Sequence, residues 1–350
     1  MSLLFIDSFD HYDRGSMDKK WSFVDCFWIV GAETWSLHVG AGRDGSTALR
    51  FIPRTNSATA AVNVAAQSTL YAGFAVKMAK YGSDQNQTFL EFSSGKQVMI
   101  GYAMSGGGQI GVWKGDFTTF LGRASCPLNQ GQWYYVETRN TVHSATGQID
   151  IRIDGKTEFT FTGDTLTGTV ASLGRISVGR GVGTISVEHI FLMDDFYLLD
   201  DQGTRNNGFL GDVRVMALMP NSDGDTIQWD PSTTGNNWQM VDETIPDSDR
   251  TYNSTSVTAE IDTFHMTDLG IGSAYVLAAQ AVFMARQDDP SRSVRPILTT
   301  NGSAYAGATV GLTGSKYTFI QEIFELNPVT ATSWTVAEVD SHQAGYELVA

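Results

Sequence analysis

The sequence is poor in cysteine and proline and has no long hydrophobic run. Its 350 residues include two cysteines, Cys26 and Cys126, and eight prolines. Neither cysteine is part of a CxxC or other metal-ligand spacing, so we expect two free thiols. No stretch approaches the roughly 18 consecutive apolar residues of a membrane helix, so we expect no membrane insertion.

Positive charge is also scarce. The chain has 23 Lys and Arg residues against 38 Asp and Glu residues, which gives a formal net charge of −15. A nucleic-acid backbone requires clustered basic side chains, and no three basic residues are consecutive here, so we expect no nucleic-acid partner. The first apolar run follows no basic segment and is interrupted by Asp7, so we expect no secretory signal. We therefore expect the protein to be made in a cytoplasm.

Several specific motifs are missing. The sequence has no GxSxG, no GxxxxGK[ST] and no HExxH, and its six histidines are scattered. These absences argue against a serine nucleophile, a phosphate-binding loop and a zinc site. The stretch 221–225 is similar to part of a calcium loop, but its glycine is two positions early and Ser232 stands where the bidentate Glu should be. We expect no cofactor, and a structural calcium ion is not indicated.

What the sequence does contain is short alternation of apolar and polar residues between Gly, Asn and Asp. This pattern is typical of an all-β sandwich or barrel. In 149–153 every second residue is isoleucine, which predicts that Asp150 and Arg152 face solvent. Asp154-Gly155 predicts a hairpin turn after this strand. The predicted strands of the first part are 71–78, 88–92, 98–102, 109–113, 132–138, 147–153, 156–161, 175–179 and 188–199.

The composition shifts near residue 200, which indicates a domain boundary. Residues 1–202 carry 16 basic and 20 acidic side chains (net −4), whereas residues 203–350 carry 7 and 18 (net −11). In the second part, 211–219 alternates like a strand. The stretch 275–286 suits a helix or a strand, and we favour a strand. A helix is predicted in 334–344, with Thr335 and Glu338 as a capping box and Gly345 as its C-cap.

The order of these elements resembles known families. Residues 1–200 resemble a concanavalin A-like (laminin G-like) jelly roll, through 5–10, 133–137, the 147–161 hairpin and 194–198. Residues 201–350 resemble the distal half of tailed-bacteriophage virion proteins, through 200–204, 209–215, 237–238, 241–243, 262–264, 327–330 and 333–339. The predicted fold is therefore all-β, with an N-terminal jelly-roll sandwich (1–200) followed by a second mostly-β domain (201–350) with one short C-terminal helix.

The resemblance implies a structural protein of a tailed bacteriophage particle, in the tail, baseplate, a fibre or a capsid decoration. It places the protein in the virion, with the second domain serving attachment or oligomerisation. The implied partners are other virion proteins and further copies of the chain, a trimer by analogy with fibres. The jelly roll implies carbohydrate binding to a host-surface polysaccharide, and hence a role in host recognition.

Two alternatives stay open. The first is a glycoside hydrolase that degrades surface polysaccharide, since some glucanases of this fold carry Glu-x-Asp-x-x-Glu on one strand. The nearest match, 260–265, ends in His265, and the adjacent Asp194 and Asp195 are expected on opposite faces of a strand. We therefore expect no enzyme. The second alternative is a non-viral glycan-binding adhesion protein, which a signal peptide or disulfides would favour.

Aromatic side chains are the remaining ligand candidates, because sugars stack their C–H faces on them. The candidates for glycan binding are Trp28, Trp35 and Trp113. Trp238, beside Asn237, is a candidate for a protein interface, where tryptophan is enriched.

Overall fold

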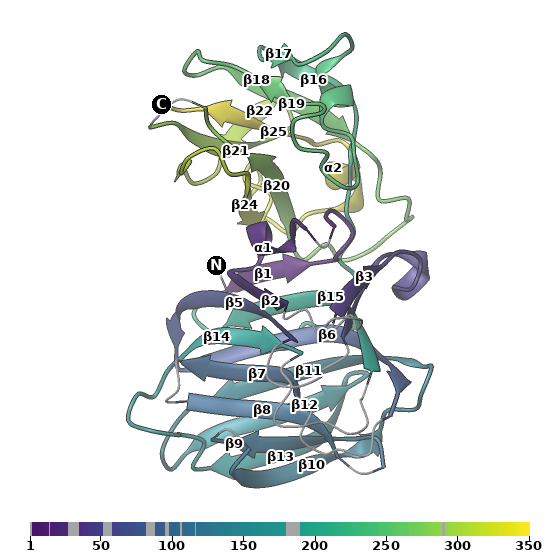
Figure 1. The fold of residues 1–350 in the computed structure, drawn as a ribbon, viewed down its shortest axis with the longest axis vertical. Helices are drawn as coiled ribbons and strands as arrows, with labels where there is room; N and C mark the ends of the chain where they lie inside the picture. The colour runs from purple at the N-terminus through teal and green to yellow at the C-terminus, as the bar shows by residue number, and fades with distance from the viewer. Residues whose placement is uncertain are drawn as a thin grey trace. The chain divides into compact units, whose positions relative to one another are not determined.

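The computed structural model describes residues 2–13, 15–26, 35–51, 58–81, 88–94, 98–105, 107–115, 117–179, 190–288 and 291–350. Strands dominate it, and its α-helices, α1 (Met17–Lys20) and α2 (Val336–Asp340), are about one turn each (Figure 1). The predicted all-β class is confirmed. Within the described ranges, no helix has the length and apolar character needed to cross a membrane.

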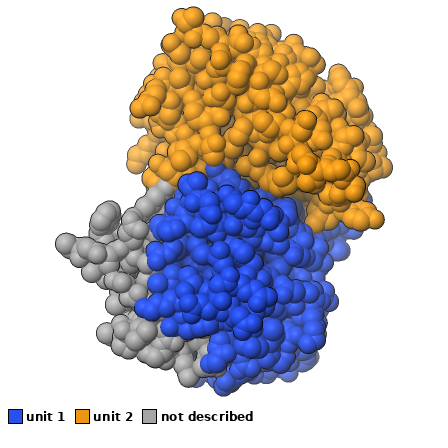
Figure 2. Space-filling model, turned by 90° about the vertical axis from the view of Figure 1, so that its right-hand side faces the viewer, with its two compact units in different colours: residues 1–10, 21–215 blue, residues 11–20, 216–350 orange. Residues whose placement is uncertain are grey.

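The chain forms two compact units, coloured separately in Figure 2. Unit 1 comprises residues 1–10 and 21–215, and unit 2 comprises residues 11–20 and 216–350. This division differs from the predicted domains 1–200 and 201–350, because residues 209–215 are bound to the first unit and residues 11–20 belong to the second. Independent folding of residues 1–200 stays a prediction.

Unit 1 contains two antiparallel sheets (Figure 1). The eight-stranded sheet has the order β13 (Lys156–Gly163), β12 (Gly147–Ile153), β11 (Trp133–Thr141), β6 (Thr69–Lys80), β15 (Ile190–Asp200), β4 (Ala48–Phe51) and β3 (Trp35–His38), with β1 (Leu3–Asp7) also beside β15. The seven-stranded sheet has the order β10 (Thr119–Pro127), β9 (Gln109–Lys114), β8 (Val98–Ser105), β7 (Thr88–Ser94), β14 (Leu173–Val178), β5 (Ala58–Gln67) and β2 (Phe23–Cys26).

Aromatic rings join the two sheets into a sandwich. Phe89 of β7 contacts Phe74 of β6 and Phe191 of β15, with ring centroids 5.8 and 6.1 Å apart. Phe74 therefore faces the interior of the sandwich. Because side chains alternate along a strand, its sequence neighbours Gly73 and Ala75 belong to the outer face of the eight-stranded sheet. The jelly-roll-like sandwich predicted for the first part is confirmed, and every strand predicted there overlaps an observed one.

Local turn chemistry also follows the sequence. Asp154 and Gly155 join β12 to β13 with φ of 49° and 77°, the left-handed values that a tight hairpin requires. The strand predicted over 211–219 is wrong. The backbone N–H groups of Gly211 and Val215 donate to side chains of the sandwich, not to a neighbouring strand.

Unit 2 is built on a six-stranded sheet. Its order is β16 (Pro220–Ile227), β19 (Ile261–Met266), β25 (Gln343–Leu348), β21 (Ser293–Thr300) and β22 (Ser303–Ala306), with β23 (Val310–Gly311) also beside β21. Two further strand pairs are β17 (Asp230–Pro231) with β18 (Asn253–Ser254) and β20 (Ala279–Ala285) with β24 (Thr318–Phe324). The N-terminal residues His11 and Tyr12 pack on Phe319 of β24, with ring centroids 5.8 and 6.1 Å away.

The elements predicted for the second part are mostly present. The strand favoured over 275–286 is β20, and the Thr335–Glu338 capping box is confirmed at the start of α2. The predicted C-cap is wrong, because α2 ends at Asp340 with Ser341 as its C-cap, and Gly345 belongs to β25. Gly345 is required there for another reason, since a Cβ at this position would overlap the carbonyl oxygen of Asp262 on β19.

Gly345→Ala tests this close approach of two strands. We expect the substitution to lower the free energy of unfolding by about 1–3 kcal/mol, because β19 and β25 must separate to admit the methyl group. Gly272→Ala is the control, since nothing lies within 4 Å of a Cβ built there. Urea unfolding measures both variants, and equal stability for the two would contradict the packing described.

Candidate functional site

The outer face of the eight-stranded sheet carries a row of side chains in direct register. Ser36 pairs with Arg50, Arg50 with Leu192, Leu192 with Lys77, and Lys77 with Trp133. Directly opposed residues of neighbouring strands point to the same face. These five residues, from β3, β4, β15, β6 and β11, are named here the basic–aromatic row.

The row combines an indole ring with two cations. The Lys77 Nζ lies 4.7 Å from the Trp133 ring centroid, a cation–π contact, and 3.5 Å from the Ala41 carbonyl oxygen. Trp133, Lys77 and Arg50 are half-buried, whereas Leu192 is buried. Among the residues that the structure describes, neither Lys77 nor Arg50 has an acidic partner. The row thus combines the aromatic ring of Trp133 and the apolar side chain of Leu192 with two cations that no described carboxylate neutralises.

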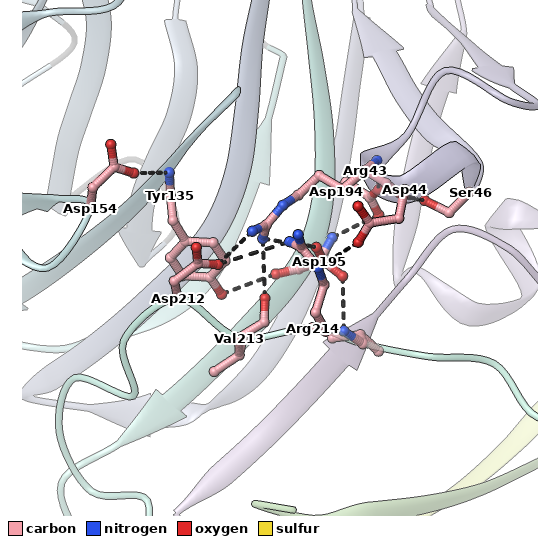
Figure 3. A network of polar contacts seen from close by, with 11 residues as sticks. Arg43, Asp44, Ser46, Tyr135, Asp154, Asp194, Asp195, Asp212, Val213 and Arg214 are labelled. Atoms are coloured by element: carbon pink, nitrogen blue, oxygen red, sulfur yellow. Dashed lines mark hydrogen bonds and ion pairs between the residues drawn. The ribbon is translucent and has the colours of Figure 1, made fainter. Parts of the chain in front are cut away.

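Next to this row, β15 contains a β-bulge at Asp195. The register of β15 against β6 shifts between Asp194 and Tyr197, and Asp195 has a φ of 50°. Asp194 Oδ2 accepts hydrogen bonds from the Arg43 backbone N and from Ser46 Oγ, both at 2.8 Å, and Asp195 Oδ2 lies 3.0 Å from Arg43 Nη1 (Figure 3). The prediction that the two carboxylates lie on opposite faces is wrong, because the bulge breaks the two-residue period.

Burial raises the pKa of both carboxyl groups. Asp194 is 1% exposed, and burial together with the charge of Asp195 raises its pKa to about 7. Burial raises the pKa of Asp195 to about 6, although the Val215 backbone N–H and Arg43 stabilise its charged form. Two adjacent carboxyl groups can therefore exchange protons near neutral pH.

An irregular segment lies across the rest of the outer face. Residues 209–215, named here the covering segment, bind side chains of β11 and β15 through their backbone. The hydrogen bonds run from Leu210 N to Tyr197 Oη (3.3 Å), from Gly211 N to Glu137 Oε1 (2.8 Å) and from Val215 N to Asp195 Oδ1 (2.8 Å). The Phe209 ring centroid lies 4.0 Å from the Arg152 guanidinium carbon. The predicted solvent exposure of Arg152 is therefore wrong, because Phe209 contacts it.

Two arginines fasten the covering segment. Arg43 binds Asp212 Oδ1 through Nη2 (2.7 Å) and donates from Nη1 to the Val213 carbonyl oxygen (3.2 Å). Arg214 reaches back to Asp195 Oδ2 (3.2 Å) and to Asp44 (Figure 3). The predicted solvent exposure of Asp150 is wrong for a related reason, since Asp150 is 8% exposed and forms an ion pair with Arg139.

The described part of the structure does not show the tryptophans predicted to bind glycan at one common site. Trp28 lies outside them, and so does the side chain of Trp35, whose backbone begins β3. Trp113 belongs to β9 of the other sheet, is 9% exposed, and contacts the rings of Phe117 and Phe120. Its burial leaves little of the ring for a sugar to contact. Trp133, whose segment 133–137 is part of the jelly-roll resemblance, is half-buried and better placed to contact a sugar.

The predicted interface residues lie in unit 2. Asn237 is 4% exposed, and its Nδ2 donates to the Trp229 carbonyl oxygen (2.7 Å) and to Asp262 Oδ2 (2.8 Å). Its side chain therefore belongs to the interior and has no surface to offer a partner. Trp238 is half-buried, with its backbone N donating to Asp223 Oδ1 (2.9 Å), and an interface role for it stays a prediction.

The glucanase-like stretch 260–265 also has a structural role. Asp262 is fully buried, and its Oδ1 accepts hydrogen bonds from the backbone N of Gln228 (2.7 Å) and of Trp229 (2.9 Å). Burial raises the pKa of Asp262. A carboxylate enclosed in this way by backbone donors holds β19 to the preceding loop. Across the part of the chain that is described, no group of three or more His, Cys, Asp or Glu side chains could hold a metal ion.

Comparison with known proteins gives likeness at the level of fold. Neither a family model nor a curated protein matches the sequence. Among solved structures, the alginate lyase Aly36B is 11% identical with a TM-score of 0.40, over 56% of this chain and 96% of that one. Domain 4 of AbnA, an extracellular GH43 arabinanase from Geobacillus stearothermophilus in complex with arabinotriose, is 16% identical with a TM-score of 0.40, over 57% and 92%. The endo-β-1,4-glucuronan lyase from Trichoderma reesei is 14% identical with a TM-score of 0.34, over 51% and 95%.

These neighbours are carbohydrate-active proteins of the β-sandwich class. At such identities the likeness shows the fold alone. The prediction that the chain is not an enzyme is nevertheless corrected, because the solved structures that it resembles include two polysaccharide lyases. Nothing in the comparisons shows a phage virion protein, so that identification stands as a proposal.

Asp194→Asn tests the buried carboxyl pair. A carboxyl group whose pKa is higher in the folded chain than in the unfolded chain costs stability as the pH rises between the two values. The wild type therefore loses stability from about pH 4 to about pH 7 at this group, and the amide does not. We expect the stability of the variant relative to wild type to rise by on the order of 2 kcal/mol from pH 5 to pH 8.

Denaturant unfolding at several pH values measures this difference. Asp164→Asn is the control, because Asp164 is exposed and Lys114 lowers its pKa, so its relative stability should not rise over this range. A pH-independent difference between wild type and Asp194→Asn would contradict the raised pKa.

Proposed function

We propose that the chain is a carbohydrate-binding structural protein of a tailed-bacteriophage particle, whose sandwich binds a host-surface glycan along the basic–aromatic row. The observation that carries this proposal is the pairing of Trp133 with Lys77 on the outer face of the eight-stranded sheet. An indole ring stacks against the apolar C–H face of a sugar, and an adjacent ammonium group donates to its oxygens.

The rest of the outer face supports this location. The covering segment binds Tyr197, Glu137 and Asp195, so the polar side chains there already hold a partner. The basic–aromatic row lies beyond the hydrogen bonds of this segment. A polysaccharide is therefore expected to contact the row. The covering segment limits how far this polysaccharide can extend over the sheet.

Exposed apolar side chains support an attachment or oligomerisation role for the second domain. Among the described residues, twelve large hydrophobic side chains are exposed, of which four belong to unit 1 and eight to unit 2. Tyr275 is 99% exposed and Val257 is 55% exposed. Where such side chains form a contiguous patch, they mark a surface that meets other proteins. The partners proposed are other virion proteins and further copies of this chain.

A second candidate function is an enzyme that degrades a surface polysaccharide. Asp194 and Asp195, with pKa values raised to about 7 and about 6, have the proton affinity of general acids and bases. Tyr135 lies beside them and donates its hydroxyl to the Asp195 carbonyl oxygen (3.1 Å). Release of reducing ends or of unsaturated sugars from a bound polysaccharide would favour this candidate over binding alone.

Trp133→Ala tests the proposed binding face. On an array of bacterial surface glycans, we expect the wild type to bind and the variant to lose about ten-fold or more in affinity, the size of one aromatic contact. Tyr275→Ala is the control, because it removes a fully exposed ring from unit 2. Calorimetry on the strongest array ligand gives the affinities. Equal loss in both variants, or no loss in Trp133→Ala, would contradict the assignment of the row.

A further inference from the structure

The spacing of the row suits a chain of sugars and not a single one. Its five residues come from five neighbouring strands, and strands lie about 4.8 Å apart, so the row is roughly 19 Å long. Arg50 and Lys77 are separated by one strand, hence by about 10 Å, with Leu192 between them. Two cations at this interval can contact two separate units of a polymer that crosses the strands.

The row is basic in an acidic chain. The whole chain has a net charge of −15, and two other arginines beside this sheet face are paired with carboxylates. Arg139 is paired with Asp150, and Arg43 with both Asp195 and Asp212. Arg50 and Lys77 have no acidic partner among the described residues, and the contacts of Lys77 with the Trp133 ring and the Ala41 carbonyl oxygen leave its charge unneutralised by any described carboxylate.

A polar atom at one end of the row has unused hydrogen-bonding capacity. The Ser36 hydroxyl is buried, and none of the described residues forms a hydrogen bond with it. Ser36 is directly opposite Arg50. A buried hydroxyl without a partner is costly, and a ligand oxygen held beside Arg50 would satisfy it.

We infer that the ligand of the basic–aromatic row is an anionic polysaccharide, with Arg50 and Lys77 contacting its acidic groups and Trp133 stacking on a sugar ring. This inference rests on the proposed carbohydrate-binding function. The acidic groups are carboxylates or sulfates, since both present oxygens to an arginine or a lysine.

Binding of the full chain to three polymers tests this inference. The probes are polygalacturonate for carboxylates, dextran sulfate for sulfates, and dextran as the neutral polymer. We expect at least one anionic polymer to bind more tightly than dextran, with an affinity that falls as salt is added. Exposed charge pairs contribute up to about five-fold each, so Arg50→Gln with Lys77→Gln should lose about ten-fold on the anionic polymer only.

The controls separate failure of the inference from failure of the function. Arg123→Gln removes an exposed arginine from β10 of the other sheet and should leave binding unchanged.

Equal affinity for neutral and anionic glycans, with Trp133→Ala still weakening both, would overturn the inference and leave carbohydrate binding intact. Anionic binding that survives the double substitution would also overturn it. No binding to any glycan would overturn the proposed function itself. If the double variant does not fold, Lys77→Gln alone and the salt dependence of the wild type provide the same test.

Discussion

The β-bulge at Asp195 and its ion pair with Arg43 organise the outer face of the sandwich. The two side chains are 4% and 10% exposed, and their atoms lie 3.0 Å apart. The same carboxylate accepts the Val215 backbone N–H, and the same guanidinium binds Asp212. This one contact therefore holds together three segments of the chain: the loop that contains Arg43, β15 and the covering segment. Breaking a buried ion pair costs about 3–5 kcal/mol. The bulge thereby fixes where the covering segment lies on the sheet.

The two units divide the work that we propose for this protein. In unit 1, the covering segment occupies the polar centre of the eight-stranded sheet, and the basic–aromatic row presents Trp133 and Lys77 beyond it. In unit 2, buried polar groups such as Asp262 and Asn237 hold the six-stranded sheet to its loops. Its exposed apolar side chains are then available for other proteins. In the function that we propose, ligand recognition and attachment therefore depend on different residues.

The sequence predicts the fold of this chain better than its site. Alternation in 147–153, the Asp154-Gly155 turn and the Thr335 capping box are local signals, and all three are correct. The site depends on contacts that are distant in sequence. Trp133 and Lys77 meet through strand pairing, and a one-residue bulge at Asp195 reverses the expected direction of a side chain. The strand pattern of 211–219 misleads because the backbone N–H groups of Gly211 and Val215 donate to side chains of the sandwich and not to a neighbouring strand.

The central claim is that the outer face of the eight-stranded sheet binds carbohydrate at Trp133. The most direct measurement is a crystal structure of the full chain with an oligosaccharide that it binds in solution. The account predicts a sugar ring stacked on Trp133, within hydrogen-bonding distance of Lys77, with the covering segment in place. A sugar bound on the seven-stranded sheet, or in unit 2, would contradict the account.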